Sequence, residues 1–313
     1  MENTMNKKKI IIYLVITYVL AWTIQSIVSV ASLKIDDPMT AQSVFKGGLA
    51  VVMFVPLLAA LITNRGLRGM GWVPKVKGNI RWIFYAAFIY IPLTVLGMVL
   101  FFLIFPDLFD INGSYIMKIY EEMGYDLNEI LSQSGMSYQT YMLVSSIGLI
   151  YAPFLNMFVA LGEEVGWRGF LYPELEKGFG KVKTWLIGGA IWAAFHFPCM
   201  FIAGYEYGTN YLGAMWLGPV VFTVCCIGLG MLEEMIYDKT KSIWFPALLH
   251  GSINAVSTFP QLVMNANSTD RLEKYMIFGP FPNGMIAMIP TLIFAIILGV
   301  LSLRKGNKYD NKD

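Results

Sequence analysis

Repeated long runs of apolar residues restrict the fold of this chain more than any other feature of its sequence. Eight windows are each apolar over about 20 residues, the length a helix needs to cross a hydrocarbon core of about 30 Å. Lipid offers the backbone no hydrogen-bond partners, so such windows cross a membrane as helices. The sequence therefore predicts an all-α, polytopic transmembrane bundle of about eight spans, at residues 10–31, 47–63, 82–105, 142–162, 184–204, 213–235, 243–264 and 285–303.

The overall composition agrees with this fold class. Of the 313 residues, 56% are hydrophobic and only 14% are charged, whereas soluble domains carry about 25% charged residues. The net charge of +2 favours no nucleic-acid partner. The three cysteines lie in apolar stretches without metal-ligand spacing, which predicts buried, inert thiols. No internal repeat or linker interrupts the chain, so we expect one membrane domain, residues 1–313.

The distribution of basic residues predicts the orientation of the bundle. The N-terminus and the connections after the second, fourth, sixth and eighth windows hold 18 of the 23 Lys and Arg residues. Cytoplasmic connections are enriched in Lys and Arg, so we expect a multi-pass protein of the cell membrane with both termini in the cytoplasm. The first window exceeds the length of a signal-peptide core, which favours an uncleaved anchor. The long acidic connection 106–141 is predicted to form a short amphipathic helix on the outer surface.

Ionisable residues inside the windows are the candidates for function, because a charge in mid-membrane costs about 2.5–3.5 kcal/mol. His196 and His250 are the only two histidines, and both lie within windows. Asn254 follows His250 by one helical turn and shares its face. Glu163 and Glu164 close the fourth window, and we expect a cleft open to the cytosol to bring these residues together. A second pair, Glu233–Glu234, is interpreted as interfacial decoration.

This set of side chains suits hydrolysis of a peptide bond. A carboxylate in a water-poor cleft is a candidate general base, which we assign to Glu163. His196 can orient the same water or carry a proton, and His250 with Asn254 can donate to the oxyanion. Neighbouring glutamates point about 100° apart on a helix. We therefore expect Glu164 to pair with Arg168 and hold the helix end.

A metal is the alternative use of the same residues. Glu163, His196 and His250 make a possible catalytic zinc set with an open fourth position. Against zinc, neither histidine lies in an HExxH helix, and no carboxylate in the windows is an evident partner for the histidines. The metal-free glutamate mechanism is favoured, and zinc stays the alternative.

The motifs around these residues resemble those of the CAAX-protease and bacteriocin-processing (CPBP, Abi) family of intramembrane peptidases. Glu163, Glu164 and Arg168 are similar to its EExxxR motif, His196 to FxxxH, and His250 with Asn254 to HxxxN. Trp192 stands where FxxxH has Phe, a change expected to alter only the shape of the pocket. Residues 142–264 would form the catalytic core. The resemblance implies a catalytic Glu163, a water-orienting His196 and an oxyanion pair, and it leaves metal dependence open.

Other functions fit the sequence less well. The chain has no HExxH motif, no serine in a GxSxG-like setting and no pair of aspartates within the windows, which argues against three other classes of membrane protease. Two alternatives remain: a non-catalytic scaffold or bacteriocin-immunity protein of the same fold, and a proton-coupled secondary transporter. For the peptidase, the expected partners are membrane lipid and a peptide or protein substrate, either lipid-modified or carrying a leader.

Overall fold

The computed structural model describes the backbone of residues 4–310 and the side chains of residues 4–304, so both ends of the predicted domain 1–313 lie outside the described residues. Within that range the protein is all-helical without a strand, as predicted. Its α-helices are α1 (Lys7–Ser32), α2 (Pro38–Val52), α3 (Val55–Asn64), α4 (Ile80–Phe88), α5 (Tyr90–Ile104), α6 (Ser114–Glu122), α7 (Leu127–Gln133), α8 (Tyr138–Gly166), α9 (Tyr172–Phe195), α10 (Phe197–Ala203), α11 (Leu217–Thr240), α12 (Trp244–Val256), α13 (Thr269–Tyr275) and α14 (Ile289–Asp310).

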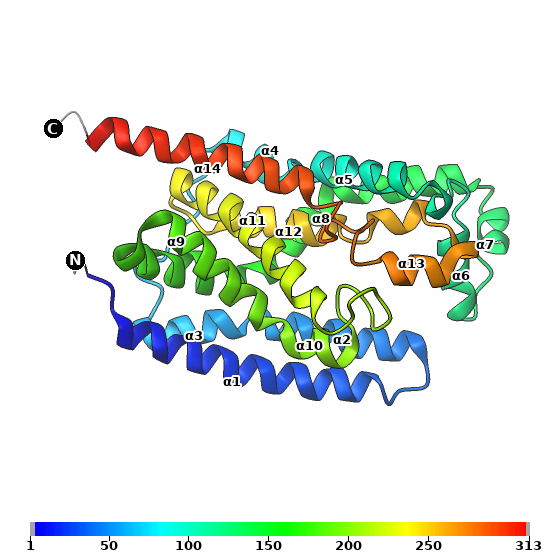
Figure 1. The fold of residues 1–313 in the computed structure, drawn as a ribbon, viewed down its shortest axis with the longest axis horizontal. Helices are drawn as coiled ribbons and strands as arrows, with labels where there is room; N and C mark the ends of the chain where they lie inside the picture. The colour runs from blue at the N-terminus through cyan, green and yellow to red at the C-terminus, as the bar shows by residue number, and fades with distance from the viewer. Residues whose placement is uncertain (1–3, 311–313) are drawn as a thin grey trace.

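The long helices run side by side along the long axis of the molecule, and α1 begins at the same end at which α14 finishes (Figure 1). Among the described residues, 5 helical stretches are long and apolar enough to cross a membrane, which confirms a transmembrane bundle. The number of spans stays a prediction, because some predicted windows do not correspond to separate long helices. The window 47–63 is divided between α2 and α3, and the window 243–264 yields only the 13-residue helix α12.

The fourth and fifth windows differ most from the prediction. Tyr138–Phe195 is one long helical stretch in which a π-helical turn, η2 (Trp167–Leu171), joins α8 to α9 and only Gly180 departs from helical geometry. Helical structure therefore continues well beyond the predicted span end at residue 162. The interruption comes instead at Gly180 inside α9, where the backbone is left-handed (φ 70°, ψ 173°). Glycine adopts this conformation without the steric cost that a Cβ atom imposes.

The connection 106–141 contains two short helices, α6 and α7, rather than the single surface helix expected. Several of their apolar residues are covered by protein. They belong to a second hydrophobic cluster, apart from the main core, which includes Ile116, Leu127, Leu131 and the segment 262–264. The Tyr138 hydroxyl also donates to the Leu262 carbonyl over 2.7 Å. The connection is thus a small cap folded onto the bundle.

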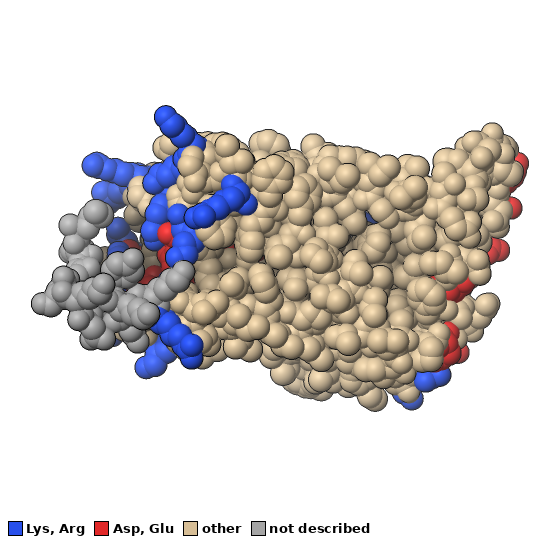
Figure 2. Space-filling model, turned by 90° about the horizontal axis from the view of Figure 1, so that it is seen from above, with Lys and Arg blue, Asp and Glu red and all other residues tan. Residues whose placement is uncertain are grey.

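Charged side chains separate to the two ends of the molecule. In Figure 2, Lys and Arg gather at the end where α1 begins, Asp and Glu dominate the opposite end, and the band between them is almost free of charge. This is the pattern expected of a membrane protein with its basic end in the cytoplasm. The side of the membrane that each end faces stays a prediction.

Close helix contacts place the Glu163–Glu164 pair at the centre of the bundle. The flanking Gly162 and Gly166 let α8 pack closely against the segment between α2 and α3. A Cβ atom at Gly162 would lie 2.5 Å from the Met53 carbonyl oxygen. On another side of α8, a Cβ atom at Gly251 of α12 would lie 2.5 Å from the Pro153 carbonyl oxygen. Small residues at helix contacts allow such approach in membranes. The two glutamates are therefore enclosed by protein.

Candidate active site

Two helical hairpins bring the polar residues of four separate sequence segments together. Glu163 lies seventeen residues before the break at Gly180 and His196 sixteen residues after it, so both lie roughly 25 Å from this turn at about 1.5 Å per residue. In the second hairpin, Glu233 on α11 and His250 on α12 lie at nearly equal sequence separations before and after Lys241. The backbone of Lys241 is left-handed (φ 50°) and makes the turn. The site is therefore set by the positions of two turns.

Both glutamates lie inside the protein rather than at the cytosolic interface. Glu163 is 1% exposed and Glu164 is completely buried. The prediction that they close a span is wrong, because α8 continues into η2 and α9. Hydropathy predicted a helix end here because it treats the two carboxylates as solvated. A charged residue that is paired can lie inside a membrane bundle without ending the helix that carries it.

The Glu163 carboxylate is held by two indole groups. Its Oε2 accepts hydrogen bonds from Nε1 of Trp167 at 2.9 Å and from Nε1 of Trp192 at 2.7 Å. The sequence motifs indicate no role for Trp167 and, for Trp192, only an effect on the shape of the pocket. That view of Trp192 is corrected here: its indole supplies a donor that phenylalanine lacks. These bonds fix the carboxylate and leave Oε1 able to accept from a water molecule.

His196 is oriented by the same tryptophan. A hydrogen bond of 3.0 Å joins its Nδ1 to the Trp192 carbonyl. A carbonyl can only accept, so Nδ1 carries the proton and the Nε2 lone pair of the neutral ring is left free. The imidazole stacks on Tyr205, with 6.0 Å between ring centroids, and meets the edge of Phe222. Trp192 therefore links the two candidate catalytic groups, through its indole and its backbone.

Glu164 belongs to a separate, charge-balanced cluster. It pairs with Arg168 at 2.8 Å, which confirms the predicted i,i+4 pair. Its Oε1 also accepts from Nδ1 of His250 at 2.8 Å. Arg168 contacts Glu233 as well, and its guanidinium lies between the rings of Tyr172 and Trp192, 4.9 and 4.7 Å from their centroids. With His250 protonated, the two cations balance the two carboxylates.

Glu233 is the site residue that sequence reasoning interpreted wrongly. The interpretation of Glu233 and Glu234 as interfacial decoration is wrong, because Glu233 is completely buried and Glu234 is 3% exposed. Arg168 is the partner of Glu233 from another helix, 65 residues away in the chain. No local pattern signals such a pair. The one signal in the sequence is that two adjacent glutamates occur within an otherwise apolar helical segment.

Asn254 lies apart from this buried cluster. It is on α12 one turn beyond His250, as predicted, but its side chain is exposed and makes no hydrogen bond to any described residue. The buried His250 has Nε2 left over after its bond to Glu164. The structure therefore places the two predicted oxyanion donors in different environments, with His250 buried and Asn254 exposed.

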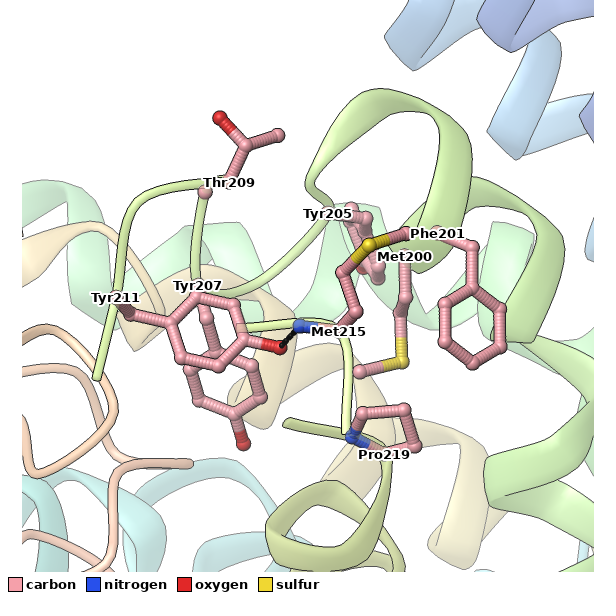
Figure 3. Close-up of a pocket in the computed structure, with 9 residues that line it drawn as sticks. Met200, Phe201, Tyr205, Tyr207, Thr209, Tyr211, Met215 and Pro219 are labelled. Atoms are coloured by element: carbon pink, nitrogen blue, oxygen red, sulfur yellow. Dashed lines mark hydrogen bonds between the residues drawn. The ribbon is translucent and has the colours of Figure 1, made fainter. Parts of the chain in front are cut away.

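A small cavity adjoins His196 through the ring of Tyr205. Its volume is about 90 Å³, and its walls come from α10, the 204–216 connection and the start of α11 (Figure 3). In the same connection, burial raises the pKa of the Glu206 carboxyl to about 7, and Asn283 donates to that carboxyl at 2.5 Å.

The ligand geometry argues against a metal held by the predicted set. Glu163, His196 and His250 do not form a group of converging donors, whereas Glu164, Glu233 and His250 have donor atoms within 4.8 Å of one another. Those two carboxylates already contact the guanidinium of Arg168. A divalent cation among them would lie beside a buried positive charge. The arrangement fits a cluster neutralised by arginine better than a metal centre.

Comparisons with known proteins agree with the motifs. Residues 145–256 match the family model described as type II CAAX prenyl endopeptidase Rce1-like. The CAAX prenyl protease 2 of Methanococcus maripaludis is 29% identical over 103 residues, which cover 32% of this chain and 37% of that protein. The chain thus aligns with little more than a third of the curated relative. Over residues 145–256, which hold all three motifs, the predicted resemblance is confirmed: this chain is similar to the Rce1-like CAAX prenyl endopeptidases of the CPBP family.

Proposed function

We propose that this protein is an intramembrane endopeptidase that hydrolyses a peptide bond in a membrane-associated or lipid-modified protein. The observation that carries the proposal is the Glu163 carboxylate, buried and held at one oxygen by two indole donors, with the free nitrogen of His196 on the neighbouring hairpin arm. The similarity to a CAAX prenyl protease supports the substrate class. The charge-balanced Arg168 cluster beside it serves as a rigid support.

The proposed reaction needs only this chain's side chains and water. Glu163 Oε1 takes a proton from a water molecule that His196 Nε2 orients, while the water oxygen attacks the scissile carbonyl carbon. The His250 Nε2–H and the Asn254 amide donate to the resulting oxyanion. Glu163 then passes its proton to the leaving amine as the C–N bond breaks. No step is routed through a metal.

A cleavage assay on protein reconstituted in liposomes tests the proposal. Three substrates are compared: a farnesylated CAAX peptide, the same peptide without the lipid, and an unrelated leader peptide, each with and without a chelator. We expect mass spectrometry to find cleavage of the lipid-modified peptide at a rate the chelator leaves unchanged. Cleavage of none of the three would favour the non-catalytic scaffold. Loss of cleavage in chelator, restored by zinc, would overturn the metal-free mechanism.

Removal of the indole donor at Trp192 is expected to slow this reaction. Trp192→Phe deletes a hydrogen bond to a charged group, which is typically worth about 1.5–3 kcal/mol. At about 1.4 kcal/mol per tenfold, kcat should fall about tenfold or more. The carbonyl that accepts from His196 remains.

The matched control is Trp185→Phe, since Trp185 is buried in the same helix but its indole nitrogen has no hydrogen-bond partner among the described residues. Equal kcat values for the two variants would contradict the role given to the Trp192 indole.

We further propose that both termini lie in the cytoplasm and that the protein resides in the cell membrane. A reporter fused after Asp313 should then read as cytoplasmic, and so should a label near Lys239. A cysteine introduced between residues 106 and 141 should react with an impermeant reagent from outside. The charge separation between the two ends supports this orientation (Figure 2). Outside labelling of the 165–183 connection would reverse it.

A further inference from the structure

His196 lies at a break in the helix that carries it. Helix α9 ends at Phe195 and α10 begins at Phe197, so His196 is the joint between them. The sequence accounts for the break, because Pro198 has no backbone N–H and cannot donate to the Ala194 carbonyl one turn earlier. A break of this kind leaves carbonyl groups without partners inside the membrane, where no bulk water can satisfy them.

Side chains of α1 supply the missing bonds. The Trp22 indole Nε1 donates to the Ala194 carbonyl at 3.0 Å, the bond that Pro198 cannot make. The Gln25 amide bridges the next missing backbone hydrogen bond, between Phe195 and Cys199. Its Nε2 donates to the Phe195 carbonyl at 2.7 Å. Its Oε1 accepts from the Cys199 backbone N–H at 3.4 Å. In an uninterrupted helix that N–H and that carbonyl would bond directly to each other.

A third contact extends the same row. The Tyr18 hydroxyl donates to the Ile191 carbonyl at 3.0 Å. Tyr18, Trp22 and Gln25 are spaced four and three residues apart, so their side chains share one face of α1. Gln25 is completely buried although it lies within a strongly apolar helix. A buried amide there is costly unless both of its ends are bonded, and here both are.

We propose that Tyr18, Trp22 and Gln25 are positioning residues that hold the break at His196 and so fix the direction of its imidazole. This inference rests on the proposed function, because it matters for catalysis only if His196 orients the water. It assigns a role to α1, which lies outside the region similar to known peptidases. The 142–264 core would then depend on the first helix for the geometry of one of its reacting groups.

Two measurements on Gln25→Leu test the proposal, one of them independent of activity. The first is the rate at which N-ethylmaleimide labels Cys199, followed by peptide mass spectrometry, with Cys225 as an internal reference. Both thiols are buried, and only the backbone of Cys199 bonds to Gln25. We expect Cys199 labelling to accelerate about fivefold or more, since hydrogen-bond losses of about 1 kcal/mol change an opening equilibrium by that factor. Cys225 should be unaffected.

The second measurement is the separation of kcat from KM. Gln25→Leu should lower kcat about tenfold with KM changed less than about twofold, because the Gln25 side chain is completely buried and cannot itself contact the substrate. If Gln25→Leu fails to fold, Trp22→Phe takes its place. This variant removes only the indole donor from a partly exposed side chain, so both effects should be in the same direction and weaker. Thr17→Val is the control, since the Thr17 hydroxyl is buried in α1 without a hydrogen-bond partner among the described residues.

Each outcome decides a different point. Faster Cys199 labelling with lower kcat supports the proposal. Unchanged labelling, or faster labelling with unchanged kcat, overturns it. A wild-type protein that cleaves no substrate, together with faster labelling in Gln25→Leu, would reject the peptidase function while leaving the capping of the break by α1 supported.

Discussion

Glu163→Gln is expected to lower peptide cleavage by about 10²–10⁴-fold, the range that a positioned general base contributes. The amide oxygen of glutamine can still accept the two indole hydrogen bonds, so the fold should be retained, but it cannot take a proton from water at neutral pH. His196→Ala should also abolish cleavage while leaving membrane insertion intact. The measurement is kcat on the reconstituted protein, with the Tm of each variant recorded in detergent.

The control for Glu163→Gln is Glu234→Gln. It removes a second buried carboxylate, from α11, that makes no contact with Glu163. Its kcat should stay within about threefold of wild type, since distant sites without shared partners act independently. Wild-type turnover in Glu163→Gln would reject Glu163 as the base. A fall in turnover matched by unfolding would show that the loss is not specific to catalysis.

Arg168→Met is expected to cause the largest loss of stability. It removes the cation between two fully buried carboxylates, Glu164 and Glu233. Breaking a buried ion pair from one side typically costs about 3–5 kcal/mol, because a charge is left without compensation. The variant should unfold at a much lower temperature, or accumulate poorly in the membrane. Thermal unfolding in detergent measures the effect.

A triple variant separates charge from packing. Arg168→Met combined with Glu164→Gln and Glu233→Gln removes both carboxylate charges, so that His250 can be neutral and the cluster uncharged, and most of the lost stability should return. Arg81→Met is the control, because Arg81 is an exposed arginine on α4 that rests on the Trp82 ring. Wild-type stability in Arg168→Met alone would contradict the account of the cluster. Failure of the triple variant to recover would assign the loss to the packing of the guanidinium between its two rings.

The sequence predicted the fold class and the helices that carry the motif residues better than it predicted the surroundings of those residues. The apolar run of α1 and the spacing of His250 and Asn254 are local features, and the structure places both on the expected helices. The true end of the fourth span could not be predicted, because hydropathy treats Glu163 and Glu164 as solvated. The indole donors of Trp167 and Trp192 were missed because aromatic residues in a membrane helix ordinarily indicate packing.

The partners across helices were the hardest to foresee. The contact of Arg168 with Glu233 and the contact of Gln25 with the α9–α10 break each join segments far apart in the chain. Both depend on which helices are neighbours, and no periodicity or motif in one helix specifies its neighbour. The Gly180 break had a local signal, since glycine occurs at residues 178 and 180 within the basic connection.

The tip of the α8–α9 hairpin offers a place to attach a reporter domain. Residues 177–180 are exposed, and no atom would approach within 4 Å of a Cβ added at Gly180. The depths of Glu163 and His196 are maintained by packing between the arms, far below this tip. A small fluorescent protein spliced in at Gly180 on flexible linkers would therefore leave the buried residues in register. It would give a folded protein that can be followed in a living cell through an internal tag, with both chain ends left untouched.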